Sequence, residues 1–221
     1  MSKVAEARGE AGDLRGRLSV GLVQLGLDLD EAQQVAMIEY LGLLEKWNAV
    51  YNLTAIRDRH EMLAAHVMDS LALIPLIKTL GIRHLLDVGS GAGLPGIPLA
   101  IALPKLQVDL VDAVQKKVAF QNQVKAQLGL VNLWPHHARV EALTLGKSPD
   151  GIVSRAFSTL AEMASLARPL LAEGGYLIAM KGQNPAREIA ELKEDWKVSD
   201  LVTLAVPGLE AQRCAVVLER R

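Results

Sequence analysis

The chain has 221 residues; half are hydrophobic, 22% are charged, and the formal net charge at pH 7 is −1. This length and composition predict one large α/β domain with a sizeable core and exclude a disordered chain. The small net charge gives no support for nucleic-acid binding, although a local basic patch would be invisible in the sum. The single cysteine, Cys214, excludes an internal disulfide and a cysteine-rich zinc site, and its apolar neighbours in the sequence predict a buried structural thiol.

Residues 1–20 are mixed and polar, without the apolar stretch of a signal peptide. No unbroken apolar run approaches the roughly 18 residues that a membrane-spanning helix needs. We therefore expect a cytoplasmic protein with no membrane segment.

Residues 1–80 predict a helical extension that packs on the rest of the chain. Residues 1–12 are small and polar and predict a frayed start, and an amphipathic helix is predicted over residues 13–25. Asp28 or Asp30 is expected to cap a second helix, because a carboxylate there can accept hydrogen bonds from the free N–H groups of the first turn.

The segment after this second helix is predicted to be irregular. Helical periodicity fails over residues 46–54, where polar and large aromatic residues alternate, so we expect a helix end followed by a loop. Asp58 is predicted to cap a helix that runs through His66, and Asp69 with the serine after it to cap another over residues 71–80. His66 and Asp69 are three residues apart and could share one helix face.

From residue 81 to 221, strand-like and helix-like segments alternate, which predicts a Rossmann-like α/β domain with a mostly parallel sheet covered on both faces. The expected strands cover residues 85–87, 107–112, 131–134, 151–154 and 176–180, and the expected helices cover residues 95–103, 114–128, 139–143, 159–171 and 185–194. Two β-rich runs, 197–206 and 212–219, predict a closing antiparallel pair and hence an antiparallel last strand. Ligands bind such sheets at the carboxyl ends of the strands.

Three glycines at alternate positions, Gly89, Gly91 and Gly93, directly follow the first of these strands. Such a turn brings free backbone N–H groups close to a ligand. The letters from Gly91 to Gly96 also match the dinucleotide fingerprint G-x-G-x-x-G, in which the strand normally leads straight into the first glycine. Here Asp87 precedes the glycines, and its charge would repel a pyrophosphate but suit a cationic or amino-bearing ligand.

The description Asp-x-Gly-x-Gly-x-Gly fits this stretch better, and it resembles the first motif of Rossmann-like S-adenosylmethionine-dependent methyltransferases. Asp112, at the end of the second expected strand, would then accept hydrogen bonds from the ribose hydroxyls, as an acid there does in NAD sites. Both features favour S-adenosyl-L-methionine as the cofactor. The alternative from a different class is a dinucleotide-binding oxidoreductase or a non-catalytic binding module.

Short segments between about residue 40 and residue 185 carry a more specific signal: Lys46-Trp47-Asn48, Asn52-Leu53-Thr54-Ala55-Ile56, His66-x-x-Asp69-Ser70-Leu71, Asp87 to Leu99, Lys116-Lys117, Arg139-Val140-Glu141, Ser154-Arg155-Ala156 and Lys181-Gly182. In these segments the chain resembles the 16S ribosomal RNA small-subunit methyltransferase G family, also called the glucose-inhibited division protein B family. The first two segments and the histidine segment share little with other methyltransferases, which makes the resemblance specific.

The resemblance implies an S-adenosylmethionine-dependent enzyme that methylates N7 of one guanine in the conserved decoding-region loop of 16S ribosomal RNA. Its partner would be this RNA or the small ribosomal subunit, and a methyltransferase for a protein or small molecule is the alternative. Together with the glycine motif, the resemblance implies a cofactor site made of Gly89, Gly91, Leu94, Asp112, Val140, Glu141 and Arg155. Relatives often carry Ala at position 140, and Val preserves a backbone contact there.

Guanine N7 has an available lone pair, so its methylation needs alignment and exclusion of water but no general base and no metal. We therefore predict neither a catalytic acid–base pair nor a metal site. Arg155 is expected to position the guanine edge or an RNA phosphate; its structural alternative is an ion pair with Asp87, Asp112 or Glu141. An aromatic ring at 47 or 51 could stack on a splayed base, although a core position is favoured for Trp47. The candidates for the RNA side are Lys46, Asn48, Arg57, His66 and Lys181.

Overall fold

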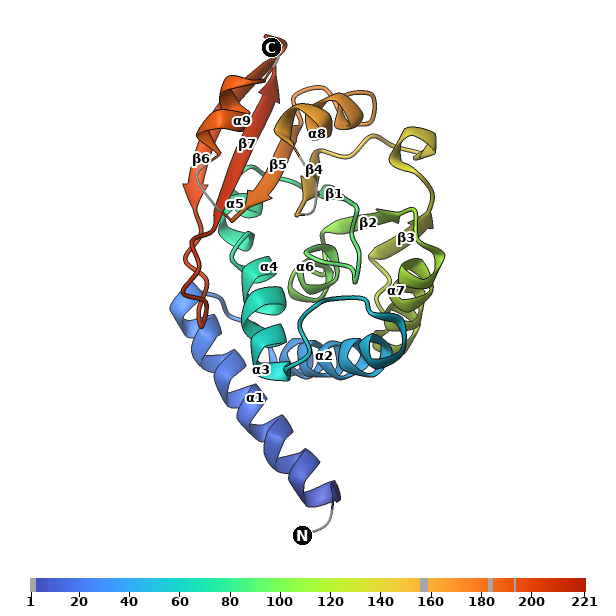
Figure 1. The fold of residues 1–221 in the computed structure, drawn as a ribbon, viewed down its shortest axis with the longest axis vertical. Coiled ribbons are helices and arrows are strands. Elements are labelled where there is room, and N and C mark those ends of the chain that lie inside the picture. Colours follow the sequence, from blue (N-terminus) through green and yellow to red (C-terminus); the bar gives the residue numbers. More distant parts are fainter. Residues whose placement is uncertain (1–2, 156–158, 183–184, 193) are drawn as a thin grey trace.

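The computed structural model describes residues 3–155, 159–182, 185–192 and 194–221. Its centre is a seven-stranded sheet with the strand order β3-β2-β1-β4-β5-β7-β6 (Figure 1). The strands are β1 (His84–Val88), β2 (Gln107–Asp112), β3 (Leu133–His137), β4 (Gly151–Ser154), β5 (Tyr176–Lys181), β6 (Trp196–Thr203) and β7 (Cys214–Arg220). Strands β1 to β5 pair in parallel, and β7 runs antiparallel to β5 and β6. The predicted mostly parallel sheet with an antiparallel last strand is confirmed.

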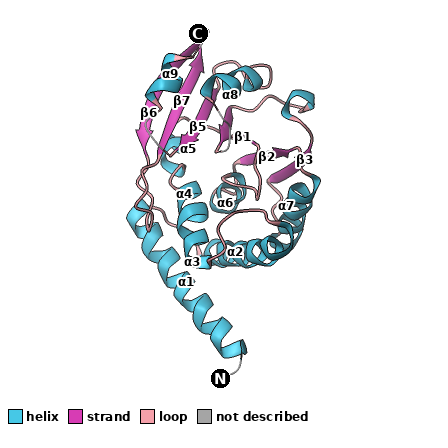
Figure 2. Cartoon of the chain, in the orientation of Figure 1, coloured by secondary structure: helices cyan, strands magenta, loops and turns pink. Residues whose placement is uncertain are grey.

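Helices cover both faces of this sheet. Those before β1 are α1 (Lys3–Leu25), α2 (Glu31–Tyr51), α3 (Arg59–Met62), the π-helix η1 (Leu63–Met68), α4 (Asp69–Leu71) and α5 (Ile74–Thr79). Those after β1 are α6 (Gly96–Ala102), α7 (Gln115–Leu128), the 3-10 turn η2 (Val140–Ala142), α8 (Leu160–Ala167) and α9 (Ala186–Ala190). Figure 2 shows α2, α6 and α7 gathered on one side of the strands and α8 and α9 on the other.

Neighbouring side chains of a strand enter different cores, because they alternate between the two faces of the sheet. Leu85 and Leu110 pack with the N-terminal helices, α6 and α7, whereas Leu86 and Val111 pack with α8. The N-terminal helices therefore share one core with the sheet. Cys214, at the start of β7, is half-buried rather than buried as predicted, and this burial raises the pKa of its thiol.

Helix α2 is bonded to α6 as well as packed near it. The Asp30 carboxylate accepts from Gln33 N at 2.8 Å, and the Gln33 side chain accepts from Asp30 N at 3.0 Å, which forms a capping box. The Gln33 amide also donates to Ile101 O and Ala102 O, two carbonyls at the C-terminal end of α6. The cap predicted at Asp30 is confirmed, and it links the two helices.

The first helix starts earlier than predicted. Helix α1 begins at Lys3, so the frayed start over residues 1–12 is wrong for the described part of that segment. Leu14, Leu18 and Leu22 recur at helical spacing and are at most 3% exposed. Because this apolar stripe anchors the helix, the polar residues before it continue the same regular element (Figure 1).

The helix end followed by a loop that was predicted over residues 46–54 is confirmed, but α2 continues to Tyr51, beyond the point where helical periodicity fails. The ring centroid of Trp47 lies 5.2 Å from that of Tyr51 and 5.6 Å from that of Phe120 in α7. This packing confirms the core position of Trp47 and outweighs the weak local helix preference. Asn52, in the left-handed conformation with φ of 50°, ends the helix.

The range Arg59–Thr79 is a nearly continuous helical segment with the π-helix in its middle. Asp58 caps it as predicted, with its carboxylate accepting from His60 N and Glu61 N at 2.9 Å. Asp69 does not cap a second helix, because it lies inside the segment and its carboxylate accepts from Arg155 instead. By length and composition this segment could cross a membrane, but 67% of its most apolar window is buried inside the protein.

Candidate active site

The glycine turn that follows β1 has the backbone that its sequence predicts. Gly89, Gly91 and Gly93 have φ values of 68°, 58° and 78°, in the left-handed region that favours glycine. At Gly93 space is a second constraint, since a Cβ atom there would lie 2.2 Å from Ile97 Cδ1. The turn ends in α6, and Gly89 N donates to Val111 O at 2.9 Å, which keeps it beside the end of β2.

Side chains from three elements hold two consecutive residues of this turn. Gly91 N donates to Asp112 Oδ2 at 2.9 Å, and Gly91 O accepts from Gln121 Nε2 at 2.8 Å. Ala92 O accepts from the hydroxyl of Tyr40 at 2.8 Å. Asp112 was predicted at this place, whereas Tyr40 and Gln121 were not, because a polar atom inside an otherwise ordinary helix carries no sequence signal.

Asp87 is buried in the interior, where it is bonded to the start of α6. Its side chain is 0% exposed, and Oδ2 accepts from Gly96 N, at the start of α6, at 2.8 Å. Among the described residues Oδ1 has no hydrogen-bond partner. Burial raises the pKa of Asp87 to about 7, against the lowering effect of the Gly96 N–H group. The interpretation of Asp87 as a charge facing a cationic ligand is therefore corrected: it braces the start of α6 from the interior.

Asp112 is the acid nearest to the surface of the turn. It is 6% exposed, and besides Gly91 N it accepts from Val114 N at 2.9 Å, while Lys117 Nζ lies 3.4 Å from Oδ2. Oδ2 accepts from both Gly91 N and Lys117 Nζ, whereas Oδ1 accepts from Val114 N alone and keeps a second lone pair. The contact with a ribose remains a prediction, and the position of Asp112 at the end of β2 agrees with it.

The other predicted cofactor residues lie around the same edge of the sheet. Gly89 is exposed and Leu94 is 5% exposed. In η2, Val140 is half-buried and Glu141 is exposed. Ala138 N donates to Asp112 O at 3.3 Å, so the chain that leads into η2 passes beside the end of β2. Parallel strands bring their carboxyl ends together, which places these residues along one edge.

Arg155 follows β4 and reaches across to the π-helix. Its guanidinium donates to Ala65 O at 3.0 Å and to Asp69 Oδ2 at 3.3 Å, and it lies 3.4 Å from His66 Nδ1. The ion pair considered for Arg155 therefore exists, but with Asp69 instead of the three acids named from the sequence. Asp69 is 2% exposed and its Oδ1 lies 3.3 Å from Arg213 Nε, so one buried carboxylate holds two guanidinium groups. Burial raises its pKa, and the two arginines oppose this.

His66 is held as a neutral imidazole. Burial, followed by the charge of Arg155, lowers the pKa of His66 to about 4. Because arginine only donates, Nδ1 of His66 is the acceptor, and Nε2–H donates to Thr54 Oγ1 at 2.8 Å. Asn48 supports this arrangement from α2: its amide donates to Ile56 O and its oxygen accepts from Thr54 N, both at 2.9 Å.

The predicted RNA-side residues divide into buried and accessible ones. Asn48 is 2% exposed, which makes it a brace and gives no support to a direct contact with RNA. Lys46 is exposed on α2, and Arg57 is exposed and donates to Asn52 Oδ1 at 3.0 Å. Lys181, at the end of β5, is half-buried and pairs with Glu188 at 2.8 Å. Ala156, from the motif of Arg155, lies outside the described residues.

A cavity of 300 Å³ joins these groups next to Arg155. Its lining residues are Ile56, Ala65, His66, Asp69, Arg155, Met180, Lys181, Gly182 and Arg213. Three of these side chains are cations and one is an acid, while His66 is neutral near pH 7. The cavity can therefore attract an anionic or electron-rich polar group. Sequence analysis missed Arg213, which lies beyond the motifs that it used.

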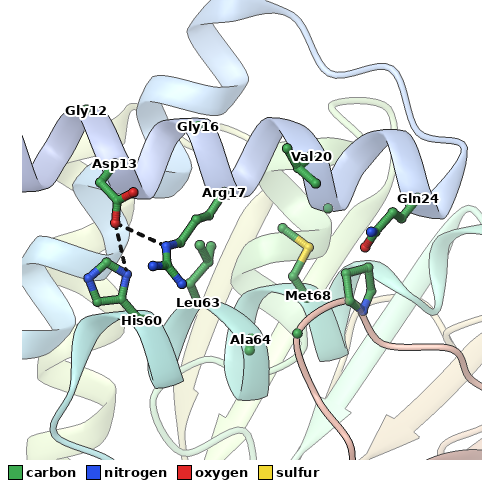
Figure 3. Close-up of a pocket in the computed structure, with 13 residues that line it drawn as sticks. Gly12, Asp13, Gly16, Arg17, Val20, Gln24, His60, Leu63, Ala64 and Met68 are labelled. Carbon is green, nitrogen blue, oxygen red and sulfur yellow. Dashed lines mark hydrogen bonds and ion pairs between the residues drawn. The ribbon is translucent and has the colours of Figure 1, made fainter.

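A larger cavity of 540 Å³ lies elsewhere, between α1, the α3–η1 segment and the turn before β7 (Figure 3). At one end, Asp13 of α1 accepts from Arg17 Nε at 3.1 Å and lies 3.6 Å from His60 Nδ1; Met68 lies farther along. None of its described lining residues comes from the glycine turn or from the ends of β2 and β4. We therefore place the candidate active site at the glycine turn and the Arg155 cavity.

Solved structures of the same architecture identify the fold. An O-methyltransferase from Streptomyces achromogenes, solved in complex with S-adenosylmethionine, aligns with a TM-score of 0.59 and 14% identity over 91% of this chain and 96% of its own. An O-methyltransferase from Bacillus cereus, in complex with S-adenosylhomocysteine, aligns with a TM-score of 0.57 and 15% identity over 83% and 91%. The chain has the fold of S-adenosylmethionine-dependent methyltransferases.

Sequence comparison identifies the family. The family model GidB, rRNA small subunit methyltransferase G, matches residues 33–217. A ribosomal RNA small subunit methyltransferase G from Burkholderia thailandensis is 51% identical over 211 residues, which cover 93% of this chain and 91% of the relative. Its counterpart from Azoarcus sp. is 48% identical over 205 residues, covering 93% and 96%. The chain belongs to the GidB family of rRNA small subunit methyltransferases, and the resemblance is confirmed over more of the chain than its motifs cover.

Proposed function

We propose that this protein transfers the methyl group of S-adenosyl-L-methionine to N7 of a specific guanine in the decoding-region loop of 16S ribosomal RNA. The observation that carries the proposal is the position of Arg155. Its guanidinium lies at the carboxyl edge of the sheet that carries the glycine turn, and it also lines a cationic cavity. Family membership over residues 33–217 supports the RNA as the substrate class.

The residues of the turn fit S-adenosylmethionine. Glycines at 91 and 93 keep the backbone free of side chains, and the carboxylate of Asp112 lies within hydrogen-bond distance of the turn. Leu94, Val140 and Glu141 would complete the cofactor site, together with the exposed Gly89 at the start of the turn. The bound cofactor supplies an electrophilic methyl group on a sulfonium. The chain's own contribution is to hold this group near the Arg155 cavity and to exclude water.

The cavity fits a guanine in an RNA strand. Arg155 can donate to guanine O6, which fixes the base while leaving the N7 lone pair free to react. Lys181 and Arg213 can contact phosphate oxygens of the same strand. The neutral His66 holds Arg155 in place and takes no proton from the substrate, since N7 carries none.

An RNA substrate implies a cytoplasmic enzyme that meets 16S RNA free or in the small subunit. The proposal is tested in a strain that lacks the gene: its small-subunit RNA should lack one N7-methylguanosine that the parent strain contains. An unchanged N7-methylguanosine pattern refutes the RNA substrate. Calorimetry distinguishes the alternative cofactor, because we expect binding of S-adenosylhomocysteine and no binding of NAD. Binding of NAD alone would favour an oxidoreductase.

A further inference from the structure

Helix α2 reaches the glycine turn through one side chain, Tyr40. This residue is 0% exposed, and its hydroxyl donates to Ala92 O at 2.8 Å. Its ring lies against Phe120 of α7, with the centroids 6.2 Å apart. Burial raises the pKa of Tyr40 far above its ordinary range, so the phenol keeps its proton and is a hydrogen-bond donor at neutral pH.

The turn's own backbone holds the peptide between Ala92 and Gly93 at its N–H group, where Gly93 N donates to Ser90 O at 2.7 Å. The residues on both sides of Ala92, Gly91 and Gly93, have positive φ and no side chain that could restrict them. Leu94 N also donates to Ser90 O, and these two bonds leave the Ala92 carbonyl to another partner. That partner is Tyr40. Without the hydroxyl this peptide would keep the bond from Gly93 N but lose the bond at its carbonyl, and the glycines on either side would let it tilt and shift the N–H groups that a cofactor must meet.

We propose that Tyr40 is a positioning residue for the cofactor, and that it makes the N-terminal helix α2 part of the S-adenosylmethionine site. The hydroxyl of Tyr40 fixes the 92–93 peptide from one side, while Gln121 fixes Gly91 O from the other. Binding of the cofactor then requires no prior ordering of the turn, which preserves affinity. This inference rests on the proposed cofactor and extends its site to a helix outside the sheet domain.

The substitution Tyr40→Phe removes the hydroxyl and keeps the ring. We expect the Kd for S-adenosylhomocysteine, measured by calorimetry, to rise by about three- to tenfold, as the loss of one neutral hydrogen bond predicts. The KM for S-adenosylmethionine should rise by the same factor. The kcat at saturating cofactor and the KM for RNA should stay unchanged, because the hydroxyl touches neither the reacting atoms nor the cavity.

Two control variants distinguish positioning from general loosening of α2. Met37→Ala removes a fully buried side chain of the same helix that has no bond to the turn, so it should lower the unfolding midpoint without raising the Kd. Tyr176→Phe removes a tyrosine hydroxyl at the start of β5, at the other end of the strand from Lys181, and should change neither the unfolding midpoint nor the Kd. Gln121→Met, which releases Gly91 O, should raise the Kd as Tyr40→Phe does.

An unchanged Kd in Tyr40→Phe overturns the inference, and so does an equal rise in Met37→Ala. The proposed function fails in a different way. If the unaltered protein shows no binding of S-adenosylhomocysteine, the cofactor itself is wrong. If the unaltered protein binds and Tyr40→Phe binds equally well, only the role of Tyr40 is wrong.

Discussion

Replacement of Asp87 by Asn tests whether the acid of the glycine motif is a buried brace. The Asp87 pKa is raised from 3.8 to about 7 in the folded protein, so folding keeps a proton on the carboxyl that the unfolded chain releases. Between these pH values the folded state binds more protons, and stability falls as pH rises. At about 1.4 kcal/mol per pKa unit, the ionised carboxylate costs about 4 kcal/mol above pH 7.

In Asp87→Asn the amide oxygen can accept from Gly96 N in place of Oδ2, and the charge is gone. We expect the variant's free energy of unfolding, relative to the unaltered protein, to rise by about 4 kcal/mol between pH 4 and pH 8. Urea unfolding followed by circular dichroism at several pH values measures this difference. The change of this difference with pH is the test of a protonated Asp87. An unsatisfied amide N–H in the variant would lower its free energy of unfolding by the same amount at pH 4 and at pH 8. A constant difference across this range would show that Asp87 is not a buried, protonatable brace.

Three other substitutions test the site. Arg155→Ala should abolish transfer of a labelled methyl group while circular dichroism stays unchanged, because Arg213 remains as a partner of Asp69; retained transfer would remove Arg155 from the site. Because the pKa of His66 is lowered in the folded state, the unaltered protein should lose about 3 kcal/mol of its free energy of unfolding as pH falls from 6.5 to about 4, and His66→Gln should not show this loss. Parallel pH profiles of the two proteins in urea unfolding would contradict this. Gly93→Ala places a Cβ atom 2.2 Å from Ile97 Cδ1 at a φ of 78° and should cost about 1–3 kcal/mol and weaken S-adenosylhomocysteine binding; an unchanged thermal midpoint and Kd would show that the turn adapts.

The elements that the sequence predicts correctly are those whose signals are local. Strands β2 and β4 have the predicted bounds, because a buried parallel strand is a short apolar run between turn residues. The caps at Asp30 and Asp58 are also correct, since a cap needs only a side chain and the backbone two or three residues later. The left-handed glycines after β1 belong to the same class of local signal.

The failures concern partners that lie far apart along the chain. Arg155 and Asp69 are 86 residues apart, and Asp69 directly follows the π-helix, a feature without a recognisable sequence pattern. Trp47 stabilises the extension of α2 because its ring packs against Phe120 of α7. The bond between Tyr40 and Ala92 spans 52 residues and has no motif of its own.

Asp87 shows how a correct motif can carry a wrong physical interpretation. The acid was recognised at the strand end, and its charge was assigned to the ligand side. In a sheet covered on both faces, however, a strand side chain enters a core whichever face it is on. Asp87 shares its face with Leu85, which packs under α6 and the N-terminal helices. The role that the structure gives Asp87 is therefore support for the start of α6, through the bond from Gly96 N.

Methyl transfer with purified components tests the central claim most directly. Small ribosomal subunits from a strain that lacks the enzyme are incubated with the protein and S-adenosylmethionine carrying a labelled methyl group, and the RNA is digested and examined by mass spectrometry. Arg83→Ala, an exposed arginine before β1, is the matched control for Arg155→Ala. We predict a single N7-methylguanosine in the decoding-region loop with the unaltered protein and with Arg83→Ala, and none with Arg155→Ala. Absence of transfer, or a label on another atom or on ribosomal protein, would contradict the account.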